Sequence, residues 1–257
     1  MHKPLAGRAI LVTRPQAQAV RLAALIEAEG GEALRFPTLA ILPPRDPAKP
    51  AALLSGAGLA KHDLAVFVSP TSVQAAFDMM ANPWPAALPV AAVGAGTARA
   101  LEARGIAGVI VPAQGADSEA VAALPRLRDM AGQRVLIVRG EDGREWLGNT
   151  LAERGAQVDY AECYRRAAPD IPPAAIAGLA QRWRGGGVDA VCITSQEALA
   201  NLLKLFTADR TFVLATPLFA AHARIAEAAS RQGFQKIITS EPGDEATLAA
   251  LEAFFQP

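Results

Sequence analysis

The sequence predicts an α/β protein built from two doubly wound parallel-sheet domains in tandem. Short apolar runs, each long enough for a strand but not for a helix, alternate with stretches of helical periodicity. This alternation is typical of parallel sheets whose strands are joined by right-handed crossover helices. The order of elements in the first half of the chain returns in the second half, and 257 residues suffice for two ordinary domains.

The clearest unit lies just past the middle of the chain. Residues 135–138 (VLIV) form an apolar run suited to a strand buried on both faces. The loop 139–144 (RGEDGR) follows, and then a helical pattern with Leu147 and Leu151 on one face. The pattern stops at Gly155, where a glycine can adopt the left-handed conformation that ends helices.

A second strand, 157–160, completes this unit. The loop after the first strand therefore lies at the carboxyl end of a strand, where open α/β sheets bind ligands. Free N–H groups at the start of the following helix favour an anion there. Arg139 and Arg144 are then candidate anion ligands, although they could instead do no more than solubilise a tight turn.

The first unit of the chain has the same layout. Strand 9–12 is followed by Thr13, a candidate helix cap, and residues 16–29 carry a helical apolar face on which we expect Val20. A second strand is expected at 33–36, before an extended, proline-bounded connection.

Three further pairs of segments continue the repeat, each with a strand followed by a helix. The pairs are 63–72 with 188–197, 90–98 with 212–216, and 109–111 with 236–239. Because residues 90–98 begin with an apolar strand, we expect residues 212–216 to form a strand as well.

Composition excludes several classes of function. The 25 basic and 25 acidic residues balance, which argues against a general nucleic-acid binder. Two cysteines and three histidines show no ligand spacing, so we expect no metal site and a reduced protein with Cys192 buried. The sequence shows no secretory signal and no apolar stretch of membrane-spanning length, so we expect a cytoplasmic location.

Nucleotide cofactors are also disfavoured. The segment around Gly94 and Gly96 has two of the three glycines of a dinucleotide fingerprint, and Arg99 stands at the third position. The sequence contains no GxxxxGK[ST] phosphate loop. We therefore expect no cofactor.

An ordered set of motifs resembles the uroporphyrinogen-III synthase family. The motifs are LVTRP, FVSPTSV, AVGAGTARAL, LIVRGEDGRE, CYRR and SEPGDEATLAAL, and together they span nearly the whole chain. One departure is the second-repeat loop 215–224, where many members have a Gly-Pro-x-Thr-like segment. This chain has ATPLFAAHAR there and resembles a histidine-containing bacterial variant, which puts in doubt a threonine role in that loop.

The resemblance implies how the units combine. Residues 1–37 and 168–257 would form one discontinuous domain, and residues 44–162 the other. The crossing segments 38–43 and 163–167 would pair as a two-stranded linker that permits hinge motion.

The resemblance also implies the activity. The substrate would be hydroxymethylbilane, a linear tetrapyrrole with eight carboxylates, which closes to uroporphyrinogen III with loss of water and inversion of the last pyrrole ring. The protein would hold a reactive azafulvene cation by positioning and electrostatics. It would act as a monomer without a cofactor, with possible hand-over from the preceding enzyme of the pathway.

Site residues are carried over by motif. Tyr164 is the candidate proton donor to the departing hydroxyl, with packing as the alternative role. The hydroxyl residues could equally be helix caps, Arg14 and Arg166 ordinary ion-pair partners, and His222 a capping or solvent-facing residue. The candidate substrate-binding residues, expected to line a cleft faced by both domains, are Arg14, Ser69, Thr71, Ser72, Gly94, Thr97, Arg139, Gly140, Arg144, Thr194, Ser195, His222 and Arg224.

Two other classes remain open from the residues. A non-catalytic, two-lobed anion-binding module would share the α/β lobes, but such modules usually carry a signal peptide or a DNA-binding helix-turn-helix. A divergent transferase or hydrolase would need a Ser-His-Asp, metal or phosphate-loop signature, which the sequence lacks.

Overall fold

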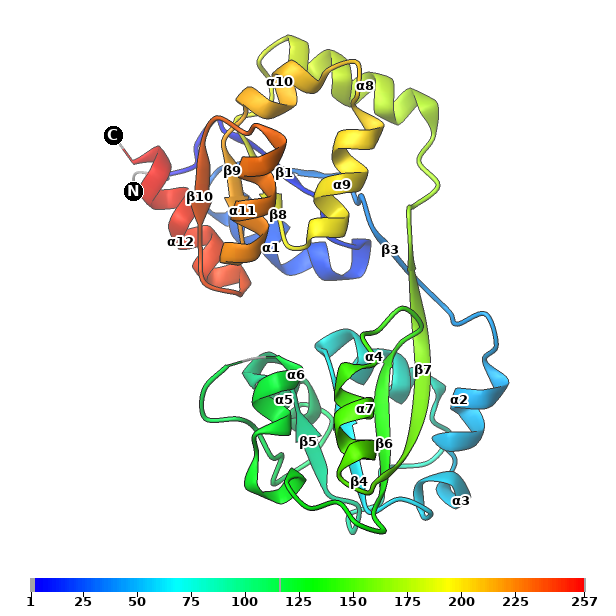
Figure 1. Cartoon of the computed structure of the whole chain (residues 1–257). Helices are drawn as coiled ribbons and strands as arrows, with labels where there is room; N and C mark the ends of the chain where they lie inside the picture. Colours follow the sequence, from blue (N-terminus) through cyan, green and yellow to red (C-terminus); the bar gives the residue numbers. More distant parts are fainter. Residues whose placement is uncertain (1–2, 116, 257) are drawn as a thin grey trace. The chain divides into compact units, whose positions relative to one another are not determined.

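The computed structural model describes residues 3–115 and 117–256 and divides into two compact units. Unit 1 combines the chain up to Ala40 with the chain from Ala167 onward, and unit 2 is Ile41–Arg166. Figure 1 follows the chain through both units, and each is considered by itself below.

The sheet of unit 1 is parallel, with strand order β10-β9-β8-β1-β2. Every residue of β1, β8 and β9 is buried, as expected for central strands covered on both faces. The strands are β1 (Ala9–Val12), β2 (Glu32–Arg35), β8 (Ala190–Ile193), β9 (Leu218–Ala220) and β10 (Ile237–Thr239).

Helices cover both faces of this sheet. One hydrophobic cluster joins Ile10 and Val12 of β1 to Leu22 of α1 and Leu251 of α12. The other packs side chains of α8, α9, α10 and α11 against the opposite face. The helices are α1 (Gln16–Ala28), α8 (Pro173–Arg184), α9 (Gln196–Leu205), α10 (Arg210–Ala215), α11 (Ala223–Gln232) and α12 (Asp244–Phe255).

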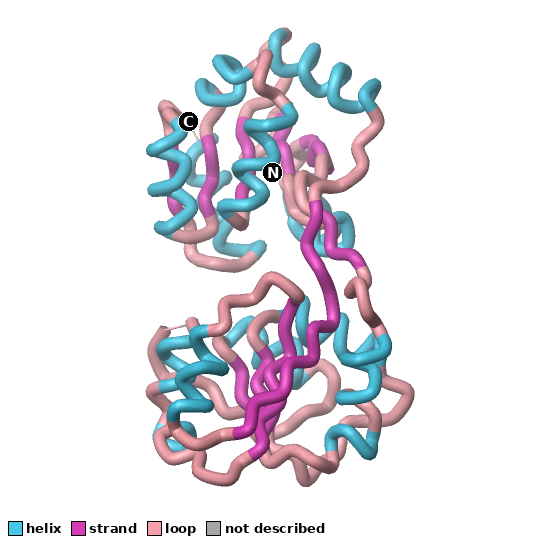
Figure 2. Tube along the Cα trace, turned by 45° about the vertical axis from the view of Figure 1, so that its right-hand side comes forward, coloured by secondary structure: helices cyan, strands magenta, loops and turns pink. Residues whose placement is uncertain are grey.

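The sheet of unit 2 has strand order β3-β7-β6-β4-β5, and the β7-β6-β4-β5 pairs are parallel. Strand β7 runs without a break from the expected strand 157–160 through the expected linker segment 163–167 (Figure 2). The strands are β3 (Ala40–Leu42), β4 (Leu64–Phe67), β5 (Val90–Ala92), β6 (Arg134–Gly140) and β7 (Gln157–Ala167).

Unit 2 is also wound on both faces. Val73 of α4 and Leu101 of α5 pack on one face, and Leu147 and Leu151 of α7 pack on the other. Its helices are α2 (Ala48–Leu53), α3 (Gly56–Leu59), α4 (Pro70–Met79), α5 (Ala95–Glu102), α6 (Ser118–Ala122), the 3₁₀ helix η1 (Pro125–Leu127) and α7 (Trp146–Glu153). The predicted α/β class with two doubly wound sheets is confirmed.

One strand prediction was wrong. Residues 212–216 do not form a strand, because most of this segment belongs to helix α10, and the strand of that repeat is β9. Phe212 is 43% exposed while Val213 is fully buried, a one-sided pattern that a short surface helix satisfies. The Thr216 hydroxyl donates to the Phe212 carbonyl (2.9 Å), and Pro217 then starts the extended segment. Residues 109–111 form only an isolated bridge, between Ile110 and Ala91.

Two expectations for the first helix were also wrong. Val20 is 54% exposed, and the buried face is carried by Ala19, Leu22 and Ile26. Thr13 does not cap α1: its hydroxyl donates to the Cys192 carbonyl at 2.8 Å and links the ends of two adjacent strands. Among the described residues, no helix is long and apolar enough to cross a membrane.

Candidate functional site

The strongest group of predicted residues lies at the carboxyl end of the unit 2 sheet. Ser69 follows β4, Gly140 ends β6, and Tyr164 lies on neighbouring β7. The Tyr164 hydroxyl is 3.3 Å from Ser69 Oγ, and the residue is only 8% exposed. A Cβ at Gly140 would lie 2.8 Å from two Tyr164 ring atoms, so the absence of a side chain there lets the ring pack directly against the strand.

Ser69 is held in place by its own helix. Its Oγ accepts from the Ser72 N–H (3.0 Å), and Ser72 Oγ accepts from the Ser69 N–H (3.1 Å), a capping box at the start of α4. Ser72 Oγ also donates to the Ser69 carbonyl, and Ser72 is fully buried. Ser72 therefore positions Ser69 rather than facing a ligand, while Thr71 lies half-buried in the first turn.

A second helix begins beside α4. Gly94 is the N-cap of α5, and Thr97 is buried in its first turn. A Cβ at Gly96 would lie 3.8 Å from the Pro70 ring, so the starts of α4 and α5 approach closely. The Ala95 and Gly96 N–H groups precede the first bonded turn, and a helix start of this kind favours an anion.

The two arginines of the β6–α7 loop are placed differently. Arg139 is 5% exposed, and its guanidinium pairs with Glu162 of β7 (2.8 Å) and donates to the carbonyls of Gly143 and Arg144. Arg144 is an exposed residue whose guanidinium makes a two-pronged pair with Glu119 (3.0 and 3.2 Å). Arg144 is accessible from solvent, whereas four of the five guanidinium N–H groups of Arg139 already donate within the protein.

The predicted residues of unit 1 also lie at the ends of strands. Arg14 follows β1 and pairs with Asp244 at the start of α12. Thr194 and Ser195 follow β8, and Ser195 caps α9 by accepting from the Ala198 N–H (3.0 Å). These contacts give Arg14 and Ser195 structural roles, and any ligand would have to be bound in addition to these contacts.

The loop after β9 contains the predicted histidine. His222 is exposed and caps α11, its Nδ1 accepting from the Arg224 N–H at 3.1 Å. The side chain of Arg224 is exposed. His222 thus has the position in unit 1 that Gly94 has in unit 2, after the strand and before the helix. The strand that corresponds to β5 is therefore β9, and not residues 212–216 as the sequence alignment had it.

Sequence reasoning missed Ser240. It follows β10, its N–H donates to the Ala220 carbonyl (2.9 Å), and its buried Oγ has no hydrogen-bond partner among the described residues. The signal was available, because the pair Thr239–Ser240 ends an apolar run in the same way as Thr194–Ser195.

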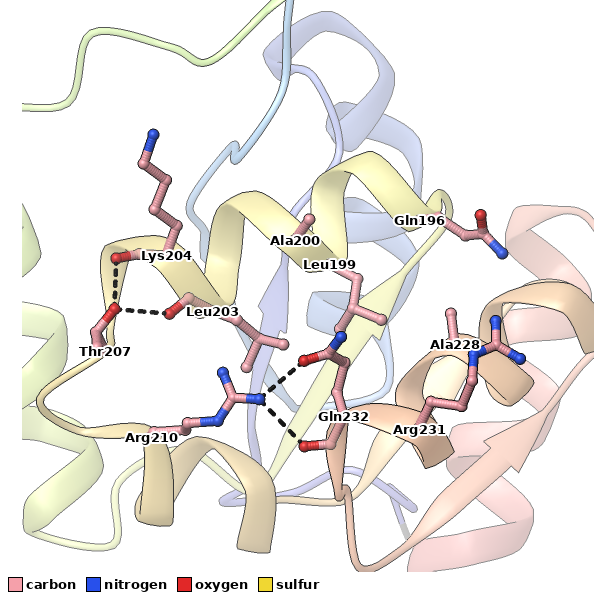
Figure 3. A pocket seen from close by; sticks show the side chains of 10 residues that line it. All are labelled: Gln196, Leu199, Ala200, Leu203, Lys204, Thr207, Arg210, Ala228, Arg231 and Gln232. Carbon is pink, nitrogen blue, oxygen red and sulfur yellow. Dashed lines mark hydrogen bonds between the residues drawn. The ribbon is translucent and has the colours of Figure 1, made fainter.

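A cavity of about 430 Å³ in unit 1 is lined by cations and by none of the predicted site residues (Figure 3). It lies between α9, α10 and α11, and three cations line it: Lys204, Arg210 and Arg231. Arg210 donates to the carbonyl and the side chain of Gln232 at the end of α11 (3.2 and 2.8 Å). Lys204 and Arg231 lie in the last turns of their helices, where cations complement the helix dipole. These charges therefore stabilise helix ends.

The cysteines are not nucleophiles. Both are buried, and burial raises the pKa of the Cys163 and Cys192 thiols to about 12. Among residues 3–115 and 117–256, no cluster of three or more acidic, histidine or cysteine side chains could hold a metal ion.

The fold and these strand-end groups define an α/β protein of two doubly wound units suited to an anionic small molecule. Comparison of the chain with a family model and with relatives of similar length identifies its family. The chain belongs to the uroporphyrinogen-III synthase family, whose model, described as uroporphyrinogen-III synthase HemD, matches residues 20–250.

Relatives and solved structures agree. Uroporphyrinogen-III synthases from Salmonella typhimurium and Escherichia coli are 34% and 33% identical, each over 95% of this chain and 99% of the relative. A mutant uroporphyrinogen III synthase from Thermus thermophilus (TM-score 0.62, 22% identity, 96% and 97% coverage) shares the fold. So does uroporphyrinogen-III synthetase from Helicobacter pylori (TM-score 0.62, 15% identity, 96% and 99% coverage). The relatives are named as enzymes, which disfavours the binding-module alternative.

Proposed function

We propose that the protein is a uroporphyrinogen-III synthase, which closes hydroxymethylbilane to uroporphyrinogen III with loss of water and inversion of the last ring. Family membership over nearly the full length supports the reaction. The observation that carries the site is the pairing of the Tyr164 and Ser69 hydroxyls at 3.3 Å beside Gly140.

Tyr164 acts as the proton donor in this proposal. Loss of the substrate hydroxyl breaks a C–O bond, and a proton from the Tyr164 hydroxyl lets the oxygen leave as water. The ring system retains the positive charge as the azafulvene cation. Ring closure moves this charge onto the attacking pyrrole, which loses it by releasing a proton, and a proton is thereby returned to the Tyr164 phenolate. Ser69 lies within reach of the phenol oxygen and orients it.

The remaining predicted residues bind carboxylates. Hydroxyls, N–H groups at helix starts and arginines suit a polyanion even in a protein of balanced charge. Within this group Ser72 and Arg139 support their neighbours, because their side-chain hydrogen bonds are made within the protein. The proposed ligands are Arg14, Ser69, Thr71, Gly94, Thr97, Gly140, Arg144, Thr194, Ser195, His222 and Arg224.

The proposal extends to the context of the reaction. The protein acts in the cytoplasm as a monomer and receives its reactive substrate from the enzyme that forms it. Two buried free cysteines are compatible with a reducing compartment. Residues 38–43 and 163–167 serve as the linker between the domains 1–37 plus 168–257 and 44–162.

Product analysis tests the function. Freshly generated hydroxymethylbilane is incubated with the protein, and after oxidation the isomer I and isomer III porphyrins are separated. We expect predominantly isomer III, in an amount that scales with protein. Isomer I alone, formed at the spontaneous rate, would refute the proposal.

A further inference from the structure

Arg139 is a buried cation of unit 2 whose guanidinium donates four hydrogen bonds. Its Nε and Nη2 both donate to Glu162 Oε1 (3.2 and 2.8 Å). Nη1 donates to the carbonyls of Gly143 (3.2 Å) and Arg144 (3.3 Å), and the guanidinium lies 4.0 Å above the centre of the Tyr160 ring. One buried side chain therefore ties the end of β6 to β7 and to the loop that follows β6.

The strand register changes at this same point. Arg139 is paired with Glu162, but the next residue, Gly140, is paired with Tyr164, so the register advances by one residue. A shift of this kind redirects the side chains that follow it. Here it places the Tyr164 ring over Gly140, with its hydroxyl near Ser69.

The contacts of Arg139 bracket the register shift. Glu162 lies two residues before Tyr164, and the anchored carbonyls of Gly143 and Arg144 lie just beyond Gly140. The loop also packs on the arginine stem, since a Cβ at Gly143 would lie 2.9 Å from Arg139 Cδ. Because Arg139 bonds to residues before and after the register shift, it keeps the Tyr164 ring packed on Gly140.

We propose that Arg139 is a positioning residue that maintains the shifted β6–β7 register and thereby holds the Tyr164 hydroxyl beside Ser69. The proposal rests on the proposed function for the role of Tyr164. It differs from substrate binding because the Arg139 side chain is buried and four donations already occupy it. Lysine retains the charge but cannot reproduce these planar, divergent bonds.

The test combines kinetics with spectroscopy on Arg139→Lys. The chain has only two tyrosines, so labelling tyrosine with ¹³C at Cζ gives two NMR signals, which Tyr160→Phe assigns. We expect the Tyr164 signal to move and kcat for isomer III to fall roughly 10- to 100-fold, as for a misplaced catalytic group. KM should stay within about twofold of the parent value, because binding is retained.

Two further variants keep the test decisive. Glu162→Gln removes the partner charge with little change of shape and should move the same signal with a smaller loss of kcat, even if Arg139→Lys does not fold. Arg184→Lys is a control for the chemical change in unit 1, where the exposed Arg184 side chain pairs with buried Asp209 (2.6 and 3.1 Å), and it should leave the signal and kcat unchanged.

Each outcome separates the hypotheses. A raised, salt-sensitive KM with an unmoved Tyr164 signal would make Arg139 a substrate ligand and overturn the proposal, as would a signal and kcat equal to the parent's. A parent protein that forms only isomer I, while the Tyr164 signal still moves in Arg139→Lys, would refute the proposed function and leave the positioning role supported.

Discussion

The Tyr164 ring packs against Gly140 of β6, which has no side chain, and its hydroxyl lies beside that of Ser69. The sequence indicated the residue through its motif, with a packing role as the alternative to catalysis. The structure buries the ring and places the Ser69 hydroxyl 3.3 Å from that of Tyr164. At the scale of the residue, the position of the Tyr164 ring depends on the absence of a side chain at Gly140.

Tyr164→Phe should lower turnover while preserving the fold. The change removes the proton donor and the contact with Ser69 but keeps the packed ring. We expect kcat for isomer III to fall by about 10²-fold, the lower range for general acid catalysis. Steady-state kinetics and the far-UV circular dichroism spectrum check this, and a fully active variant would exclude Tyr164 as the donor.

Gly140→Ala should damage both activity and stability. The new Cβ would lie 2.8 Å from the Tyr164 ring, so the ring must shift, and overpacking of this kind costs about 1–3 kcal/mol in the free energy of unfolding. Gly178→Ala is the control, because a Cβ there meets nothing within 4 Å in the middle of α8. The control should be neutral or stabilising by up to about 1 kcal/mol. Urea unfolding that gives equal free energies for the two variants would contradict the prediction.

At the scale of the element, strand ends and helix starts carry the polar groups. The sequence suggested hydroxyls either as caps or as ligands, and Ser69 and Ser195 are indeed N-caps. A cap fixes the first turn of its helix and so fixes where the free N–H groups point. His222 and Gly94 have equivalent positions in the two units although their chemistry differs. Capping and ligand binding are therefore compatible for one side chain.

Arg144→Ala tests the loop after β6. Arg144 is 58% exposed in its side chain, and its pair with Glu119 contributes little stability, so the fold should persist. We expect KM to rise, with the largest effect at low salt, where the lost attraction is least screened. Kinetics at two ionic strengths measure this, and a parental KM at low salt would show that Arg144 does not bind the substrate.

At the scale of the whole molecule, long-range contacts join segments that are distant in the chain. In unit 2, Asp159 of β7 accepts from Arg134 of β6 (3.0 Å) and lies 3.1 Å from Nε2 of buried His62. Burial by itself raises the pKa of Asp159, but the hydrogen bonds and charges of Arg134 and His62 outweigh it, and the pKa lies below its usual value. This carboxylate therefore stabilises the fold when it is ionised.

Asp159→Asn should lower stability in a pH-dependent way. Because the folded-state pKa is depressed, the contribution of Asp159 is fully present above its unfolded pKa of about 3.9 and is lost as the pH falls through the lower folded value. The variant should be less stable than the parent at pH 7, and the difference should shrink below about pH 4. Urea midpoints measured across this range check it, and a difference that does not change with pH would show that the ionised carboxylate is not responsible.

Local sequence determined the alternation of strands and helices, the tandem repeat and the strand-end positions of the polar residues. These follow from periodicity and capping preferences among neighbours in the chain, which act whatever the rest of the molecule does. The same reasoning misplaced the strand at 212–216, because a short apolar run suits a helix as well as a strand until its neighbours decide which face is buried.

Only the tertiary structure decided whether the side chains of Arg139 and Ser72 are buried and bonded within the protein. Whether a charge is buried and saturated or exposed and available depends on segments far away in the chain, as with Arg139 and its partner Glu162 on another strand. The register shift that brings Tyr164 over Gly140 is likewise a property of two paired strands. Such pairings arise from packing between distant segments, so the pattern within any one segment does not contain them.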